Sequence, residues 1–189
     1  MRLSKRIINI LLFPAKEWRL IKEEPDTPVQ IFRQYVVIMA AIPSLALFCK
    51  AGLSQQHPVV SLFIVTTTYI LNLAGTYALA LIIDTLSPSF SASKNMHQSF
   101  KISAYAITPY WLCGGAFNLI PFLSKTGILI GGCYFLYLLL LGVREIKDVP
   151  QEKQILFSMT VAMLAFVAYL AVHLLLINPL MVMATIAIM

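Results

Sequence analysis

Charged residues are scarce in this sequence. Only 12% of the 189 residues are Asp, Glu, Lys or Arg, while 59% are hydrophobic, and the mean hydropathy is +0.82. A soluble domain has about 25% charged residues, because its whole surface meets water. A chain this poor in charge must hide much of its surface in lipid. The composition therefore excludes an ordinary soluble domain and predicts an integral membrane protein.

Cysteine, histidine and catalytic motifs are also sparse. The cysteines fall in apolar stretches without paired spacing, which argues against a disulfide framework. The histidines are expected at different levels of the membrane, so they cannot converge on one metal ion. No HExxH, GxSxG or Walker loop is present. We therefore expect no catalytic residue, metal, cofactor or enzymatic activity. The residues concerned are Cys49, Cys113, Cys133, His57, His97 and His173.

Long apolar runs, by contrast, fill most of the chain. Each has roughly the 20 residues that an α-helix needs to cross the hydrocarbon core of a bilayer. We expect an all-α fold, a polytopic membrane helix bundle with five transmembrane helices. Residues 178–189 are also apolar but too short to cross alone, so they either continue the fifth helix or lie in the interface. The expected spans are residues 33–53, 59–83, 100–123, 126–142 and 154–177.

Lys and Arg are divided unequally between the segments that flank these spans. Of the 14, only Lys50 and Lys125 fall on one side of the expected membrane, and the others fall on the opposite side. The positive-inside rule then places the N-terminus in the cytoplasm and the C-terminus outside, in a multi-pass protein of the cytoplasmic (inner) membrane. The same rule accounts for the dispersed basic residues, so they do not indicate nucleic-acid binding.

Residues 1–30 form a separate cytoplasmic amphipathic segment before the five-span domain of residues 31–189. Apolar residues recur there at helical spacing, while most Lys and Arg lie elsewhere on the helical wheel. We expect an interfacial helix, broken at Pro14, on the anionic lipids of the inner leaflet. In the alternative interpretation, the charges only set the topology. The apolar residues of the pattern are Leu3, Ile7, Ile10, Leu11, Trp18 and Ile21.

Small residues recur on the faces of several spans. Gly127 and Gly131 form a GxxxG pattern in the fourth span, and Gly114 and Gly115 are adjacent in the third. Such residues let helices approach closely, so we interpret them as helix-packing positions. A GxxxG face can equally join two copies of a chain, which makes a homo-oligomer a second hypothesis.

Polar side chains inside the second and third spans have two interpretations. They can hydrogen-bond between packed helices, or they can line a transport pathway. The packing interpretation is favoured, because ionisable residues are absent from the expected mid-bilayer positions. The polar residues concerned are Asn72, Tyr105, Tyr110 and Asn118.

The third span, within KISAYAITPYWLCGGAFNLIPFL, contains Pro109. In a soluble helix this proline would remove the hydrogen bond to the Tyr105 carbonyl. In lipid, neighbouring helices, hydroxyl groups or water can satisfy the freed carbonyl, so a kink is tolerated. A packing kink is one interpretation, and a hinge or broken helix lining a cavity is the other.

Asp84 ends the second span at the cytoplasmic border. A carboxylate at a helix C-terminus opposes the helix dipole and therefore needs a compensating partner. Arg144 and Lys101 are expected at the same level, and we predict an ion pair with one of them, Arg144 in the first place. The alternative is a proton or ligand site at Asp84.

Ordered landmarks run along the chain: FPAKEWRLIKEE, IDTLSPSF, SAYAITPYW, IPFLSKTGILIGGCYFLYLLLLG and VREIKDVPQEK. Together they resemble the Yip1-domain family of membrane proteins, in its bacterial branch, over nearly the whole chain. The resemblance implies a five-span bundle with a cytoplasmic N-terminus. Eukaryotic members act in early secretory-pathway traffic and contact small GTPases. Here EPDTP stands near the place of a DLYGP-like element and departs from it, so neither GTPase binding nor a catalytic residue is carried over.

Two functions fit these observations. The first is a non-enzymatic scaffold or organiser that contacts membrane lipids and presents its N-terminal helix and residues 144–153 to a cytoplasmic protein. The second is a small transporter or channel for an ion, lipid or amphiphile, formed by the polar faces of the second and third spans around Asn72, Tyr105, Tyr110 and Asn118.

Overall fold

The computed structural model describes residues 3–53, 57–120 and 123–178, and these ranges contain helices and no strand. The helical segments, in chain order, are α1 (Leu3–Leu12), α2 (Pro14–Glu23), α3 (Pro28–Ile31), η1 (Phe32–Val36), α4 (Val37–Leu53), α5 (Pro58–Leu86), η2 (Ser87–Phe90), α6 (Met96–Ala106), α7 (Thr108–Asn118), α8 (Ser124–Ile146), α9 (Gln151–Val172) and η4 (His173–Ile177). The continuation of the chain through residues 179–189, which the sequence left open, lies outside the described residues.

Four helical stretches are long and apolar enough to cross a membrane. A multi-pass helical membrane bundle is therefore the fold of this chain, as the composition predicted. The four stretches match the first, second, fourth and fifth expected spans. They are Pro28–Lys50, Pro58–Phe90, Lys125–Ile146 and Gln151–Leu175.

The third expected span is divided between α6 and α7, which meet at Ile107. Each helix has 11 residues, about 16 Å at 1.5 Å per residue, so neither alone crosses a bilayer core. Pro109 lies in the first turn of α7, where its missing N–H leaves no intrahelical bond unmade. The proline thus starts a new helix, so the broken-helix interpretation describes the backbone better than a simple kink. A count of five spanning helices is not confirmed.

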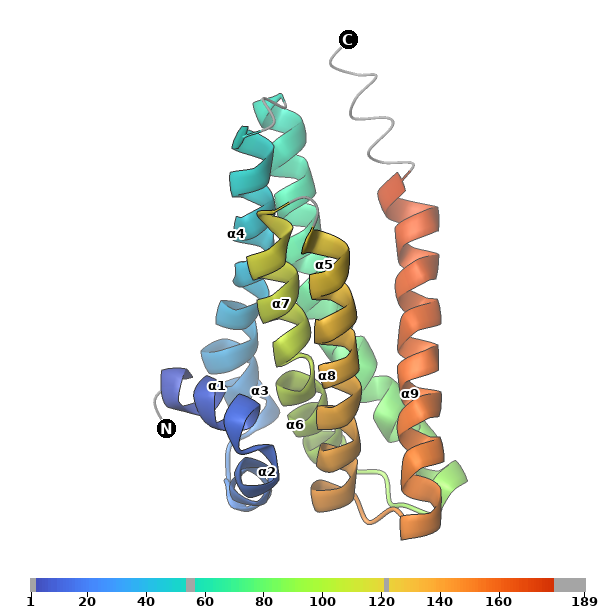
Figure 1. Ribbon diagram of the computed structural model, residues 1–189. Helices are drawn as coiled ribbons and strands as arrows, with labels where there is room; N and C mark the ends of the chain where they lie inside the picture. The colour runs from blue at the N-terminus through green and yellow to red at the C-terminus, as the bar shows by residue number, and fades with distance from the viewer. Residues whose placement is uncertain (1–2, 54–56, 121–122, 179–189) are drawn as a thin grey trace.

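The two short helices form the middle of the bundle. In Figure 1, α6 and α7 follow one another along the bundle, with α7 packed against α4 and α8 and α6 packed against α5 and α8. Every residue from Ser99 to Ala106 is buried. α9 packs along α5 and α8. The core of the lower half is therefore built around α6.

A helical hairpin formed by α1 and α2 crosses one end of this bundle. The chain breaks at Phe13, and Pro14 opens α2, which confirms the predicted break at Pro14. The hairpin lies at the same end as η2 and the connection between α8 and α9, while η4 lies at the opposite end (Figure 1). The lower end of the bundle therefore collects the N-terminal segment and the charged connections.

The apolar face of the hairpin is covered by protein. Ile10, Trp18 and Ile21 are fully buried, while Leu3, Ile7 and Leu11 pack against the same core. We expected this face to lie on the lipid leaflet, and that expectation is wrong. The face packs against protein instead, and α2 lies against the apolar surface of α8.

Candidate functional site

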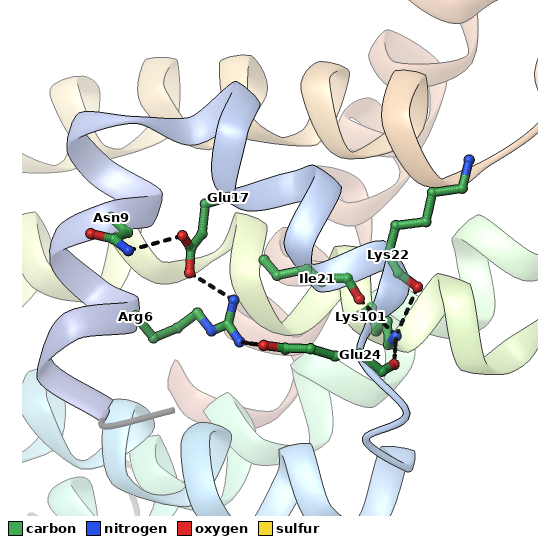
Figure 2. Close-up of polar contacts among 7 residues, drawn as sticks. All are labelled: Arg6, Asn9, Glu17, Ile21, Lys22, Glu24 and Lys101. Atoms are coloured by element: carbon green, nitrogen blue, oxygen red, sulfur yellow. Dashed lines mark hydrogen bonds and ion pairs between the residues drawn. The ribbon is translucent and has the colours of Figure 1, made fainter.

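Arg6 is a cation on the buried face of α1. It follows Leu3 by three positions and precedes Ile10 by four, so all three point to one side of the helix. Its side chain is 5% exposed, and its Nη1 atom donates to Oε1 of Glu17 at 2.7 Å. Its Nη2 atom donates to the carboxylate of Glu24. Figure 2 shows the guanidinium directed between the two carboxylates.

The carboxylates determine the charge state of this cluster. Burial alone lowers the pKa of the Arg6 guanidinium, but the hydrogen bond to Glu24 and the charges of Glu24 and Glu17 raise it above its ordinary value. Asn9 donates from Nδ2 to the second oxygen of Glu17 at 3.0 Å. The cluster is therefore a charged, hydrogen-bonded unit, as a buried ion pair must be if it is not to cost stability.

Lys101 ties the end of α2 to α6. The last carbonyl groups of a helix have no partner within the helix, and a cation suits them. The Lys101 residue is 3% exposed. Its Nζ atom donates to the Ile21 carbonyl at 2.7 Å, and also to the carbonyls of Lys22 and Glu24. In Figure 2 the Lys22 side chain points away from this contact. Lys101 is thus a cap for α2 and not the partner of Asp84.

An aromatic cluster lies beneath the Arg6 ion pairs. The Tyr105 ring centroid lies 4.6 Å from that of Tyr35 and 6.3 Å from that of Trp18, both edge-on. The Arg6 guanidinium lies 5.4 Å from the Tyr105 ring centroid, within cation–π range. The Tyr35 hydroxyl is 2.6 Å from Oγ1 of Thr108. These contacts join the hairpin, η1 and the break between α6 and α7.

A second polar cluster joins the ends of α5, α6 and α8 around Asp84. Its Oδ1 atom accepts the Asn95 N–H at 2.8 Å and the Ser99 hydroxyl at 3.0 Å. Within the described ranges, the cation at ion-pair distance is Lys147, with 3.5 Å between Nζ and Oδ1. The predicted pairing with Arg144 is wrong, because α8 ends at Ile146 and the extended Lys147 turns inward while Arg144 is exposed. The α6 N-terminus and Lys147 together compensate the carboxylate.

The glycines of the GxxxG pattern face α7 of the same chain. A Cβ on Gly127 would lie 2.5 Å from Cβ of Phe117, and one on Gly131 would lie 3.0 Å from Cα of Tyr110. Both distances are below normal contact, so these glycines allow the close packing of α7 on α8. The contact occupies the face on which the homo-oligomer hypothesis was based.

Three other glycines differ in what they contact. Gly115 touches α4, since a Cβ there would lie 2.8 Å from Cγ2 of Ile42. Gly114, which we expected to allow a close approach as well, has no atom within 4 Å of such a Cβ. Gly142, which the sequence did not single out, lies under the Trp18 ring, because a Cβ there would lie 2.9 Å from Cζ2 of Trp18. The missing side chain at Gly142 therefore lets the hairpin pack closely on α8.

The polar residues of the alternative pathway do not share one environment. Tyr105 belongs to the aromatic cluster, and Tyr110 is half-buried beside Gly131. Asn72 is half-buried in α5, and its Nδ2 atom has no hydrogen-bond partner among the described residues. The side chain of Asn118 lies outside the described residues. In that part of the chain, no group of three or more His, Cys, Asp and Glu is placed to hold a metal ion.

The fold and these clusters define a class, a multi-pass helical membrane protein whose N-terminal hairpin is locked onto one end of the bundle. The Yip1 domain is the family that matches this chain, over residues 8–173. The match covers most of the sequence, so the chain belongs to the Yip1-domain family. The resemblance drawn from the sequence is confirmed at the level of the family, and its bacterial branch stays a prediction. A search of curated proteins finds no match, and neither does a search of solved structures.

Proposed function

We propose that this chain is a non-enzymatic scaffold or organiser of the cytoplasmic membrane, which binds a cytoplasmic protein at the charged end of the bundle. The observation that carries the proposal is the attachment of the hairpin by buried charges. Arg6 and Lys101 are both nearly inaccessible and fully engaged. Attachment of this kind presents the outer surface of α2 in one orientation, and pre-organised surfaces bind with less entropic cost.

The proposed recognition surface, called here the charged face, consists of exposed charged residues on α2, on the end of α8, in the connection between α8 and α9 and on the start of α9. An ion pair of 3.4 Å between Nε of Arg19 and Oε2 of Glu145 joins α2 to α8. The two signs are interspersed, which suits a protein partner with a complementary mixed pattern better than a uniformly anionic one. The charged face comprises Lys16, Arg19, Lys22, Glu23, Arg144, Asp148, Glu152 and Lys153.

The orientation is part of the proposal. The positive-inside rule places the charged face in the cytoplasm, because the cations of this end outnumber those of the other. If α6 and α7 together complete one crossing, the C-terminus lies outside. This layout leaves the charged face as the surface that a cytoplasmic protein meets.

The test is capture of partners from native membranes with charge-reversal variants. Lys22→Glu combined with Arg144→Glu changes the charged face, and Lys125→Glu, at the other end of the bundle, is the matched control. We expect the double variant to lose partners that the wild type and the control both retain. Capture that is equal in all three proteins would contradict the proposal.

A transporter is the second candidate, and the unpartnered Asn72 amide favours it. A buried amide without a hydrogen-bond partner is uncommon, and polar groups inside membranes often mark a pathway. Liposome flux that disappears in Asn72→Leu while the fold persists would support transport. Partner capture unaffected by Asn72→Leu would support the scaffold.

A further inference from the structure

The two helices of the hairpin meet α8 at different levels. The Tyr134 hydroxyl donates to the Leu11 carbonyl of α1 at 2.6 Å, while the Trp18 ring of α2 rests on Gly142. α8 ends at Ile146, so at 1.5 Å per residue Tyr134 lies about 18 Å from that end and Gly142 about 6 Å from it. Figure 1 likewise shows α1 beside the lower part of the bundle and α2 nearer its end.

The charges of the hairpin are distributed according to these levels. α2 carries exposed Lys16, Arg19, Lys22 and Glu23, as expected of a helix at the lipid headgroups. In α1, the guanidinium of Arg6 is neutralised by two carboxylates, and Asn9 is bonded to one of them. Lys5 is exposed, and its long side chain can reach the headgroups from a deeper level. The described part of α1 therefore carries one exposed cation, and its ammonium can stay at the headgroups while the rest of the helix lies deeper.

The outer edge of α1 is uncovered, and it is apolar apart from Lys5, which stands seven positions before Leu12 on the same side of the helix. Ile8 is 54% exposed, Leu12 is 65% exposed and the adjoining Phe13 is 62% exposed. On α8, the Tyr137 ring lies 5.5 Å from the ring of Tyr134 and is 46% exposed, and α8 is one of the candidate membrane spans. The exposed α8 surface that lies beside the contact with α1 therefore belongs to a candidate membrane span.

We propose that Ile8, Leu12 and Phe13, the outer edge of α1, lie among the phospholipid acyl chains of the leaflet at the charged end, with α2 at the headgroups above them. Continuity with the lipid-facing surface of α8 identifies acyl chains as the occupant. The lipid-contacting residues are therefore different from those the amphipathic pattern indicated, since Ile10, Trp18 and Ile21 are buried in protein. α1 is a partly inserted helix confined to one leaflet.

Spin-label accessibility tests this proposal. A nitroxide is attached to Leu12→Cys or Ile8→Cys, in a full-length background whose Cys49, Cys113 and Cys133 are replaced by Ala, in vesicles of phosphatidylcholine and phosphatidylglycerol. The ratio of accessibility to dissolved oxygen over accessibility to a water-soluble nickel complex reports depth. Lys22→Cys is the headgroup-level reference, and Leu129→Cys, 68% exposed on α8, is the lipid reference.

We expect both α1 positions to show a several-fold higher ratio than Lys22→Cys and to resemble Leu129→Cys. Equal ratios at Leu12 and Lys22 would place α1 no deeper than the headgroups and overturn the proposal. Low accessibility to both reagents would also overturn it, because a second copy or another protein would then cover the edge. All the labelled positions are exposed, and a single symmetric gel-filtration peak for each labelled protein shows that the fold is retained.

Discussion

The Lys147 ammonium lies 3.5 Å from Oδ1 of Asp84, and this contact fastens the connection between α8 and α9 to the end of α5. The Lys147 side chain is 0% exposed, and its Nζ atom also donates to the Ser93 and Asn95 carbonyls at 3.3 and 3.4 Å. One buried lysine therefore holds together the α8–α9 connection, the end of α5 and the segment before α6, at the end of the bundle where the charged face lies.

Asp84→Asn should destabilise the protein because it leaves the buried Lys147 charge without its counter-ion. Removing one partner of a buried ion pair costs about 3 kcal/mol. The free energy of unfolding in mixed detergent micelles measures the loss. Arg144→Gln is the control, since this exposed side chain lies outside the pair, and its effect should stay within about 0.5 kcal/mol. A larger effect for Arg144→Gln than for Asp84→Asn would contradict the assignment of Lys147, in place of Arg144, as the partner of Asp84.

The stability should also depend on pH through Lys147. Burial lowers the pKa of this lysine below its ordinary value of 10.5, although the charge of Asp84 opposes the shift. Between the folded and unfolded pKa values, the unfolded chain binds more protons, so the contribution of Lys147 to stability increases as the pH rises toward 10.5. Lys147→Met should lack this increase when unfolding is measured from pH 8 upward. Parallel pH profiles for the two proteins would contradict the prediction.

Gly127→Ala should weaken the packing of α7 on α8. The added methyl group would lie 2.5 Å from Cβ of Phe117, and overpacking of this kind costs roughly 1–3 kcal/mol. Gly132→Ala is the matched control, because a Cβ there has no atom within 4 Å and alanine favours a helix over glycine. Thermal unfolding should show a lower midpoint for Gly127→Ala alone. A lower midpoint for Gly132→Ala alone would mean that a different face of α8 packs on α7.

Patterns local in sequence predicted much of this fold. The apolar runs indicated four of the spanning helices, and Pro14 indicated the break in the hairpin. Pro109 indicated an irregular third span, although not that Ile107 would divide it into two helices. Such features depend on length, periodicity and proline chemistry within a few residues, so one sequence suffices to read them.

The clusters were missed because their members are distant in sequence. Tyr35 and Thr108 are 73 positions apart, and Lys101 and Ile21 are 80 apart. Arg6 carried a usable signal, since a cation between Leu3 and Ile10 on a buried face requires an acidic partner. Its particular partners, Glu17 and Glu24, follow only from the turn at Phe13 and the path of the chain beyond α2.

Lys101→Met should loosen the hairpin. It removes the donor to the last carbonyls of α2, and bonds to a charged group are worth about 1.5–3 kcal/mol. Hydrogen exchange should accelerate in α1 and α2 while α9 keeps its protection. Lys94→Met, at an exposed position, should leave the exchange of the hairpin unchanged. Unaltered exchange in Lys101→Met would show that the hairpin is held by its apolar contacts alone.

The central measurement is the side of the membrane on which α8 begins. The charged face comprises residues on α2 and at the end of α8, so the whole face is cytoplasmic only if α6 and α7 jointly cross the bilayer. Lys94 precedes α6 and Lys125 lies in the first turn of α8, and both are exposed. Each is replaced by Cys in the cysteine-free background and treated with an impermeant maleimide. We expect Lys125→Cys to react in intact cells, and Lys94→Cys to react only after permeabilisation. Reaction of both positions from the same side would contradict it.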